Sequence, residues 1–561
     1  MARQRQGFGV VGAIACALWC ATARPALADI DPPTLAGLMD LLSDQQIPEA
    51  RAEIDGLRAQ EGDELSSPVL GFAHARTLFL EGRYTEAVAV SQAILAQVPE
   101  GLEAPARALR DEAMRSQDAV KGFDEFVSED RRFQIRYQGK DRLIVPWLVD
   151  VLRAQDDALA RIFGGRTRGP VLVELYPNPL WLAKVSPLTE KELETSGTIA
   201  LCKHNRLMVT SPRGLARGYG WRDTVAHEFV HYYISRYSAE SVPIWLHEGL
   251  AKYFERAWRG TTGLVLDPPE EDLLARSLKA DQLVTFSQMH PSLAKLPSQE
   301  SAALAYAQVH TVVDFLVRKK GPESLLALLD RLRAGDEMDP ALRKTYGFAL
   351  DGLWTAWKRD VTARGFKSFP GLVQTPLKFK RPGQADDPAA DAAPDFASMT
   401  DKKVRDAAHL GELLRARGRH RAALMEYDKA VVAGADAHPL VQNGAAASLR
   451  ALGRHEEVAA RLERVRLYYP GELTTWLNLA GAAYALAEQA PQRRAEALAA
   501  YEEAFGINPF HPEVLTALVA LYTQAGDTAR AGRIRDALAQ LGATPQHGAP
   551  SAPASAPTET R

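Results

Sequence analysis

Two histidines and a glutamate near the middle of the chain have the spacing of a metal site. His227 and His231 are four residues apart in the segment 221–234, whose sequence is WRDTVAHEFVHYYI. Residues four apart on a helix project from the same face, so both imidazoles can bind one ion. Glu228 is rotated by about 100° from His227, which places its carboxylate beside the ion. There it can accept a proton from a water molecule on the metal, so the pattern predicts metal-assisted hydrolysis.

The third ligand has to come from another element. Zinc suits two imidazoles and one carboxylate, with a fourth position open for water and substrate. The segment 243–255, PIWLHEGLAKYFE, has the apolar spacing of a second buried helix, and sixteen residues separate its Glu248 from His231. His247 could compete as a ligand, although two adjacent side chains do not easily point at one ion. One zinc ion held by His227, His231 and Glu248 is therefore predicted.

The alternative to a metal site is a helix that carries two incidental histidines. Val230 and Ile234 on the ligand face, with Val225 and Phe229 opposite, indicate a helix that is apolar all round and therefore buried. Unpaired imidazoles and a carboxylate would be costly in such surroundings. A bound metal would satisfy them, which favours the metal site.

The segments that must position these residues have the sequence patterns of both strands and helices. Segments 133–137 and 171–176 alternate or are rich in β-branched residues, and segments 198–202 and 206–210 read as a hairpin that turns at His204-Asn205. Helical segments lie between and after these strands. Residues 126–366 are therefore predicted to form one α+β domain.

Helical repeats are predicted on both sides of this domain. Residues 29–125 have helical spacing, and LEGRYTEA at 80–87 resembles the turn and second helix of a tetratricopeptide repeat. The sequences GRHRAA and GRHEEV begin at Gly418 and Gly453, which are 35 residues apart. Residues 400–541 are thus expected to form three to four stacked helical hairpins, with irregular hairpins as the alternative. A linker rich in Pro, Ala and Asp is expected at 367–399 and a disordered tail at 542–561.

The first residues have the pattern of an export signal. Arg3 and Arg5 precede an uncharged stretch, and Ala-Leu-Ala at 26–28 fits cleavage before Asp29. A signal peptide over residues 1–28, an extracytoplasmic mature protein and no membrane span after cleavage are therefore predicted. An uncleaved membrane anchor is the alternative.

Composition and charge narrow the function classes. The chain has 561 residues, 46% of them hydrophobic and 24% charged, which fits several soluble folding units. Its net charge of −3 offers no basic field for nucleic acid. Cys202 is the one cysteine outside the predicted signal, so no internal disulfide is expected in the mature chain.

The two motif segments together resemble a known class of enzymes. A His-Glu-x-x-His helix followed by Trp-Leu-x-Glu-Gly-x-Ala-x-Tyr-Phe-Glu is similar to the gluzincin metallopeptidases, and most similar to the smaller peptidase-MA-like domains that occur with tetratricopeptide repeats. The resemblance implies a zincin-like fold, zinc bound by His227, His231 and Glu248, and Glu228 as general base. The hairpin at 198–210 precedes the metal helix in the order that zincins use for their substrate-binding edge strand.

Departures from the family pattern bear on specificity. The aminopeptidases of this class carry a Gly-x-Met-Glu-Asn segment that holds the substrate's amino terminus; this sequence lacks it, which favours an endopeptidase. The spacing from His231 to Glu248 is two residues shorter than in those enzymes, and His247 stands where they have Asn.

Four further side chains are candidates for supporting roles. Gluzincins use a tyrosine or histidine from a later helix to stabilise the oxyanion, and Tyr306 and His310 are four residues apart; Tyr306 is the predicted catalytic residue, with core packing as the alternative for both. Asp223 could orient an imidazole, but an acidic residue in a first helical turn is already explained by the helix dipole. Glu255 could support a ligand or lie on a solvated helix face.

The predicted function is hydrolysis of peptide bonds by a zinc endopeptidase. Its substrate would be a protein or peptide, and the repeats would bind protein partners. Two alternatives stay open from the sequence: an inactive zincin-like module in an extracytoplasmic repeat scaffold, and a zinc hydrolase that acts on something other than protein.

Overall fold

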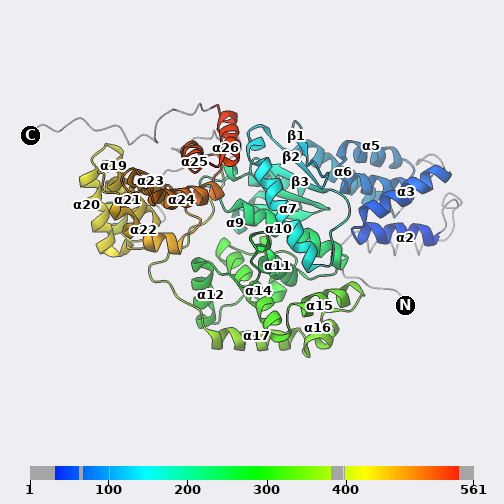
Figure 1. Ribbon diagram of the computed structural model, residues 1–561. Helices are drawn as coiled ribbons and strands as arrows, with labels where there is room; N and C mark the ends of the chain where they lie inside the picture. The colour runs from blue at the N-terminus through cyan, green and yellow to red at the C-terminus, as the bar shows by residue number, and fades with distance from the viewer. Residues whose placement is uncertain (1–31, 62–66, 100, 381–395, 397–398, 543–561) are drawn as a thin grey trace, which may run out of the picture.

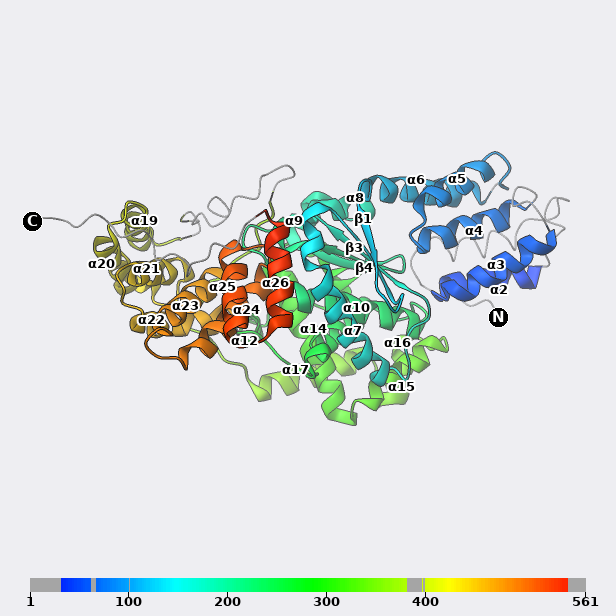
Figure 2. The ribbon, with the colours of Figure 1, turned by 45° about the horizontal axis from the view of Figure 1, so that its top comes forward.

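The computed structural model describes residues 32–61, 67–99, 101–380, 396 and 399–542. The predicted signal segment, its cleavage site and nearly all of the predicted tail lie outside these residues. A central part that holds the sheet lies between two groups of helices at opposite ends of the molecule (Figure 1; Figure 2). Among the described helices, none is both long and apolar enough to cross a bilayer.

The N-terminal group contains helices α2 to α6, with bounds Pro32–Ser43, Ile47–Glu61, Pro68–Leu80, Tyr84–Ile94 and Glu103–Ala119. The predicted turn lies between α4 and α5, where Gly82 has a φ of +76° that favours glycine. Leu70, Phe72, Leu78 and Ala87 are buried in a core of this group's own.

The sheet has five strands in the order β1-β2-β3-β5-β4. Their bounds are Asp124–Val127, Phe133–Tyr137, Val171–Tyr176, Ala200–Lys203 for β4 and Arg206–Thr210 for β5. Strands β2, β3 and β5 are parallel, whereas β1 and β4 pair antiparallel at the two edges. The predicted strands and hairpin are confirmed; β1 was not predicted from the sequence. His204 and Asn205 form the hairpin turn with positive φ angles of 53° and 60°.

One face of the sheet packs on helices that carry the candidate site. Val173 and Leu207 lie on this face in the main core, with α7 (Val145–Ile162) and α10 (Trp221–Ser238). Helices α11 (Ile244–Phe254) and α14 (Gln299–Lys320) follow in the same core (Figure 1). The other helices of this part are α8 (Leu182–Val185), α9 (Glu190–Ser196), α12 (Pro268–Ala280), α13 (Phe286–Met289), α15 (Glu323–Arg333), α16 (Met338–Tyr346) and α17 (Leu350–Arg364).

The opposite face of the sheet is fixed to the N-terminal helices by buried polar groups. Glu174 on β3 accepts a hydrogen bond from Tyr84 of α5 (2.6 Å) and pairs with Arg206 of β5 (3.2 Å); both Glu174 and Arg206 are fully buried. At the hairpin tip, His204 lies 2.8 Å from Glu112 of α6, and Asn205 donates to the carbonyl oxygen of Leu80 (3.2 Å). The tip of the β4–β5 hairpin is therefore held by α4 and α6, and α5 is joined to it through Glu174.

The C-terminal group contains four consecutive pairs of helices. They are α19 (Lys402–Ala416) with α20 (His420–Ala430), α21 (Pro439–Ala451) with α22 (Glu456–Tyr468), α23 (Leu473–Leu486) with α24 (Arg493–Ile507), and α25 (Pro512–Gln524) with α26 (Thr528–Gln540). The last pairs share a core with the central part. Phe505 of α24 packs on Trp147 of α7 with ring centroids 5.1 Å apart, and the carbonyl oxygen of Ile507 accepts from the backbone N–H of Tyr219 (3.1 Å).

The first part of the predicted linker is packed against its neighbours. The backbone N–H groups of Phe369, Val373 and Lys380 donate to the Asp272 carboxylate (2.8 Å), the Tyr469 hydroxyl (2.7 Å) and the Gly214 carbonyl oxygen (3.0 Å). Residues 367–380 thus connect α12, the C-terminal helices and the loop before α10. The Pro-rich stretch from Pro382 to Pro394 lies outside the described residues.

Candidate metal centre

The three predicted ligands converge from two helices. His227 and His231 lie one turn apart on α10, and Glu248 comes from α11. Oε2 of Glu248 lies 3.3 Å from Nε2 of His227 and 3.2 Å from Nε2 of His231. The side chains are buried, and their ligand atoms all lie within 4.8 Å of one another. Within the described residues, this is the one group of histidines and acids close enough to hold a metal ion.

These distances fit a small divalent cation. Atoms bound tetrahedrally at 2.0–2.1 Å from zinc are about 3.3–3.4 Å apart, close to the spacing of Glu248 Oε2 from each imidazole nitrogen. Two imidazoles and one carboxylate are a donor set that zinc accepts, and a fourth position stays open for water or substrate. The side chains present therefore fit a single zinc ion.

A glycine allows α11 to reach this position. A Cβ atom at Gly249 would lie 2.7 Å from both the carbonyl oxygen of Val309 and the side chain of Val313 on α14. Real Cβ atoms do not approach backbone oxygen so closely, so α11 and α14 can pack at this distance only with glycine here. The residue next to the predicted ligand Glu248 thus fixes the depth at which α11 lies.

Glu228 lies beside the predicted ligands with one oxygen free. Its side chain is buried, and within the described part of the chain Oε2 has no hydrogen-bond partner. Burial raises the pKa of this carboxyl group, an effect that the neighbouring His231 and His227 oppose, while the backbone N–H of Cys202 on β4 donates to it. A buried carboxylate with an unused acceptor atom next to a metal site is what a general base for water requires.

Each predicted histidine ligand has a partner on its second ring nitrogen. Nδ1 of His227 lies 3.1 Å from Oε2 of Glu255, and Nδ1 of His231 lies 2.5 Å from Nδ1 of His247. Such partners set the tautomer and the ring orientation of metal-binding histidines. Glu255 is buried, so of its two predicted roles the structure favours support of a ligand over a solvated helix face.

His247 lies where it can support the predicted ligand His231. Its ring lies on the far side of His231, and its Nε2 is 3.3 Å from Oγ of Ser235. Burial and the charge of His231 lower the pKa of His247 to about 3. Its ring is therefore neutral, and it can donate a hydrogen bond through one nitrogen and accept one through the other. Its nitrogens are thus engaged with His231 and Ser235, away from Glu248.

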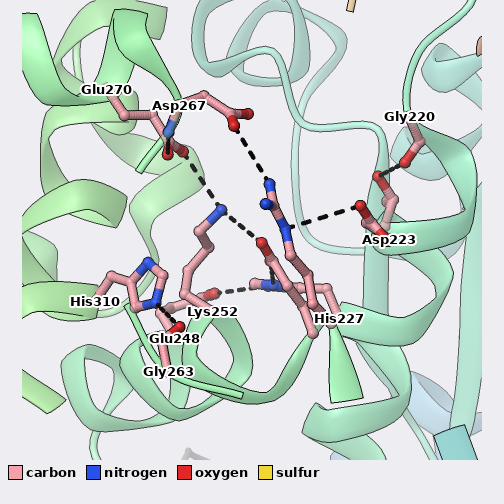
Figure 3. Close-up of polar contacts among 12 residues, drawn as sticks. Gly220, Asp223, His227, Glu248, Lys252, Gly263, Asp267, Glu270 and His310 are labelled. Atoms are coloured by element: carbon pink, nitrogen blue, oxygen red, sulfur yellow. Dashed lines mark hydrogen bonds and ion pairs between the residues drawn. The ribbon is translucent and has the colours of Figure 1, made fainter. Parts of the chain in front are cut away.

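The weaker candidates separate in space. The ring of Tyr306 lies 6.1 Å from that of His227, at the metal centre. His310, one turn further along α14, is instead fully buried and places Nε2 3.0 Å from the carbonyl oxygen of Gly263. Asp223 lies against Trp258 (2.9 Å) and away from the imidazoles. Figure 3 shows Asp223 and His310 on either side of the His227–Glu248 contact.

Charge is concentrated at the centre. Burial opposes protonation of His227, but its hydrogen bonds to Glu248 and Glu255 outweigh this effect and raise its pKa to about 10 in the metal-free protein. Burial likewise opposes ionisation of Glu248, but His231 and His227 hold its pKa well below the usual range. The two carboxylates therefore favour positive charge at this position. A divalent ion can replace that positive charge.

Two residues around the site were not found from the sequence: Lys252, which is partly buried, and Gln155, which is fully buried. Lys252 of α11 places Nζ 2.9 Å from Oε1 of Glu255. Gln155 of α7 donates to the carbonyl oxygen of Phe254 (3.0 Å) and accepts from the backbone N–H of Trp258 (2.8 Å), which fixes the end of α11. Lys252 lies four residues from Glu248 and three from Glu255, a spacing that could have suggested a shared helix face.

Comparison with known proteins covers the part of the chain that holds the site. No curated protein matches the chain. Residues 154–363, from within α7 to within α17, match the family model described as the Peptidase MA superfamily. The matched segment contains all of the predicted ligands, Glu228 and Tyr306. This match supports a metallopeptidase-like domain of the zincin type in residues 154–363.

Proposed function

We propose that this protein is a zinc-dependent endopeptidase. The observation that carries the proposal is the convergence of the His227 and His231 Nε2 atoms on Glu248 Oε2, at 3.3 and 3.2 Å, with the unpaired oxygen of Glu228 beside them. Zinc bound there would supply Lewis acidity to a water molecule and to the scissile carbonyl group. Glu228 then takes a proton from the attacking water and passes it to the leaving amine.

Other parts of the chain would bind and orient the peptide. Among the described residues, β4 pairs with β5 alone, and it donates a backbone hydrogen bond to Glu228, so an extended peptide added to its other edge would run past the general base. Tyr306 would donate its hydroxyl proton to the developing oxyanion. Since β4 reads Ala-Leu-Cys-Lys and carries no acid to grip a free amino terminus, internal cleavage is favoured over aminopeptidase action.

The flanking helices and the N-terminal segment belong to the same proposal. The repeat-like helices would recruit protein substrates or partners, and the predicted signal at 1–28 would bring the enzyme out of the cytoplasm. N-terminal sequencing of the protein recovered from an extracytoplasmic fraction tests cleavage of the signal: a chain that begins near Asp29 supports it, and an intact Met1 favours the uncleaved anchor.

Metal content and cleavage together test the activity. Purified wild type is expected to hold one zinc per chain and to cleave casein or a quenched fluorescent peptide. Glu228→Gln should keep the zinc and lose at least about 100-fold in kcat/KM, because the proton acceptor is gone while the predicted ligands remain. The exposed Glu463 on α22 gives a matched control, and Glu463→Gln should behave as wild type.

Three results would contradict the proposal. Equal rates for wild type and Glu228→Gln would show that the cleavage comes from a contaminant. Stoichiometric zinc without cleavage of any peptide would favour the scaffold alternative or a non-peptide substrate. Absence of zinc after careful loading would remove the metal site itself.

A further inference from the structure

A row of charged side chains continues from the metal centre into the protein. Glu248, Lys252 and Glu255 lie at positions i, i+4 and i+7 of α11 and its C-terminal end, so they form one stripe that faces His227. The Glu255 carboxylate uses its two oxygens on two different partners: Oε2 faces Nδ1 of His227, and Oε1 faces Nζ of Lys252. On the far side, Lys252 reaches Oε1 of Glu270 at the start of α12 (3.4 Å; Figure 3).

The pair formed by Lys252 and Glu255 is unlike the surface ion pairs of this chain. Its side chains are only 14% and 9% exposed, whereas Arg83 and Glu86, at the same i, i+3 spacing, are 46% and 54% exposed. Exposed pairs contribute little, but removing one partner of a buried pair leaves an uncompensated charge and allows its counterpart to move. Lys252 is therefore suited to holding the Glu255 carboxylate in one orientation.

We propose that Lys252 is a positioning residue for the metal centre: it holds the Glu255 carboxylate against Nδ1 of His227 and so fixes the ring that presents Nε2 to the ion. This inference rests on the metal site of the proposed function. The hydrogen bonds of Lys252 are to Glu255 and Glu270 and not to the predicted ligand atoms, so it can orient the His227 ring only through Glu255. Partners of this kind typically change metal affinity by about 10- to 100-fold.

The direction of the effect separates positioning from simple charge. A lysine near the site repels a divalent cation, so if charge alone mattered, Lys252→Met would bind zinc more tightly. If Lys252 positions Glu255, the same change loosens the carboxylate and then the His227 ring, and zinc leaves faster. Methionine keeps most of the length of the aliphatic stem, which limits the loss of packing.

Release of zinc from the full-length protein tests this inference. Wild type, Lys252→Met, Glu255→Gln and the double variant are loaded with one zinc and mixed with excess chromogenic chelator, and the rate of release is recorded. Each single variant should release zinc about tenfold faster than wild type. The double variant should release it no faster than Glu255→Gln, because Lys252 acts only through that carboxylate. Lys344→Met removes a lysine from an ion pair with Asp336 far from the site, and should match wild type.

Release from Lys252→Met at or below the wild-type rate would overturn the inference, and so would a double variant whose rate is the product of the two single effects. If Lys252→Met does not fold, as judged by circular dichroism, Lys252→Gln is measured against the same criterion. The proposed function fails separately: wild type that holds zinc but cleaves nothing refutes the peptidase, while the release rates still decide the role of Lys252.

Discussion

The buried ion pair of Glu174 on β3 and Arg206 on β5 allows a prediction in which loss of one partner costs more stability than loss of the other. Glu174 forms ion pairs with Arg206 (3.2 Å) and Arg136 (3.4 Å) and accepts hydrogen bonds from the hydroxyls of Tyr84 (2.6 Å) and Tyr176 (2.7 Å). Arg206, also fully buried, has Glu174 as its ion-pair partner, donates to Oγ of Ser116 (3.1 Å) and lies over the rings of Phe79 and Tyr84. Loss of the acid should therefore cost more than loss of the arginine.

Glu174→Gln leaves the buried Arg206 guanidinium without the carboxylate that pairs with it. The pKa of Arg206 is raised despite the opposing effect of burial, because Tyr84 and Glu174 stabilise its charge, so the group cannot lose its proton to relieve the cost. Breaking a buried pair in this way costs about 3–5 kcal/mol, and we expect about 4 kcal/mol for Glu174→Gln. Arg206→Met leaves Glu174 with Arg136 and two hydroxyls, so we expect about 2 kcal/mol.

The double variant tests the pairing itself. Arg206→Met with Glu174→Gln removes both charges, so its cost should be at least about 2 kcal/mol less than the sum of the single costs. Thermal unfolding of metal-free protein, followed by circular dichroism and tryptophan fluorescence, measures the effect. For a folding unit of 150–250 residues, each kcal/mol shifts Tm by about 2–4 °C, so Glu174→Gln should lower Tm by about 8–16 °C.

The matched control is Glu463→Gln, an exposed substitution of the same chemical kind that should change stability by less than about 0.5 kcal/mol. Equal costs for the two single variants would refute the predicted inequality of the partners. Additive costs in the double variant would refute the pairing, because they would mean that the two buried charges do not depend on each other.

Three further predictions concern the surroundings of the site. Gly249→Ala should push α11 away from α14, because the new Cβ atom would lie 2.7 Å from a carbonyl oxygen; zinc affinity, measured by competition with a chelator, should fall at least about tenfold, and unchanged affinity would contradict the packing argument. His247→Ala should weaken zinc binding by about tenfold since Nδ1 of His231 loses its partner, whereas His247→Asn should restore much of it; equal affinities for all three proteins would exclude a supporting role. Burial lowers the pKa of His310 to about 4 in the folded protein, against about 6.5 in the unfolded chain. Below pH 6.5 the unfolded chain therefore gains a proton that the folded protein does not bind, and the free energy of unfolding falls by about 3 kcal/mol in total as the pH drops towards 4. His310→Gln, which keeps a donor for the carbonyl oxygen of Gly263, should therefore show a smaller fall of Tm between pH 7 and pH 5 than wild type, and an identical fall would contradict the assignment.

The local parts of the site follow from the sequence because they depend on helix and strand periodicity. Four-residue spacing is enough to place His227 and His231 on one face, and the alternation of 133–137 is enough to predict a strand. The turn at His204-Asn205 was also predictable, since asparagine tolerates the left-handed backbone that a tight hairpin needs.

The parts that the sequence did not reveal depend on distant partners. Strand β1 has four exposed residues and is held by pairing with β2, so it carries no burial pattern of its own. Residues 367–380 are held in place by hydrogen bonds to the Asp272 carboxylate and the Tyr469 hydroxyl. Both partners are far away in the chain, so the local composition could not predict these bonds. Whether Glu255 is solvated or buried could be decided only once α10 was placed beside α11.

The short spacing between the two motif segments illustrates the same division. Sixteen residues separate His231 from Glu248, two fewer than in the aminopeptidases that the motif resembles. Helix α10 ends at Ser238 and α11 begins at Ile244, so the chain reverses within residues 239–243. It does so because Ala239 and Glu240 both adopt left-handed backbone, with φ of 53° and 56°, which ends α10 abruptly. Such a conformation costs a non-glycine residue about 1–3 kcal/mol, so the packing of α11 must contribute enough stability to offset this cost. The tight turn thus compensates for the missing residues, and Glu248 still lies within 3.3 Å of both imidazoles.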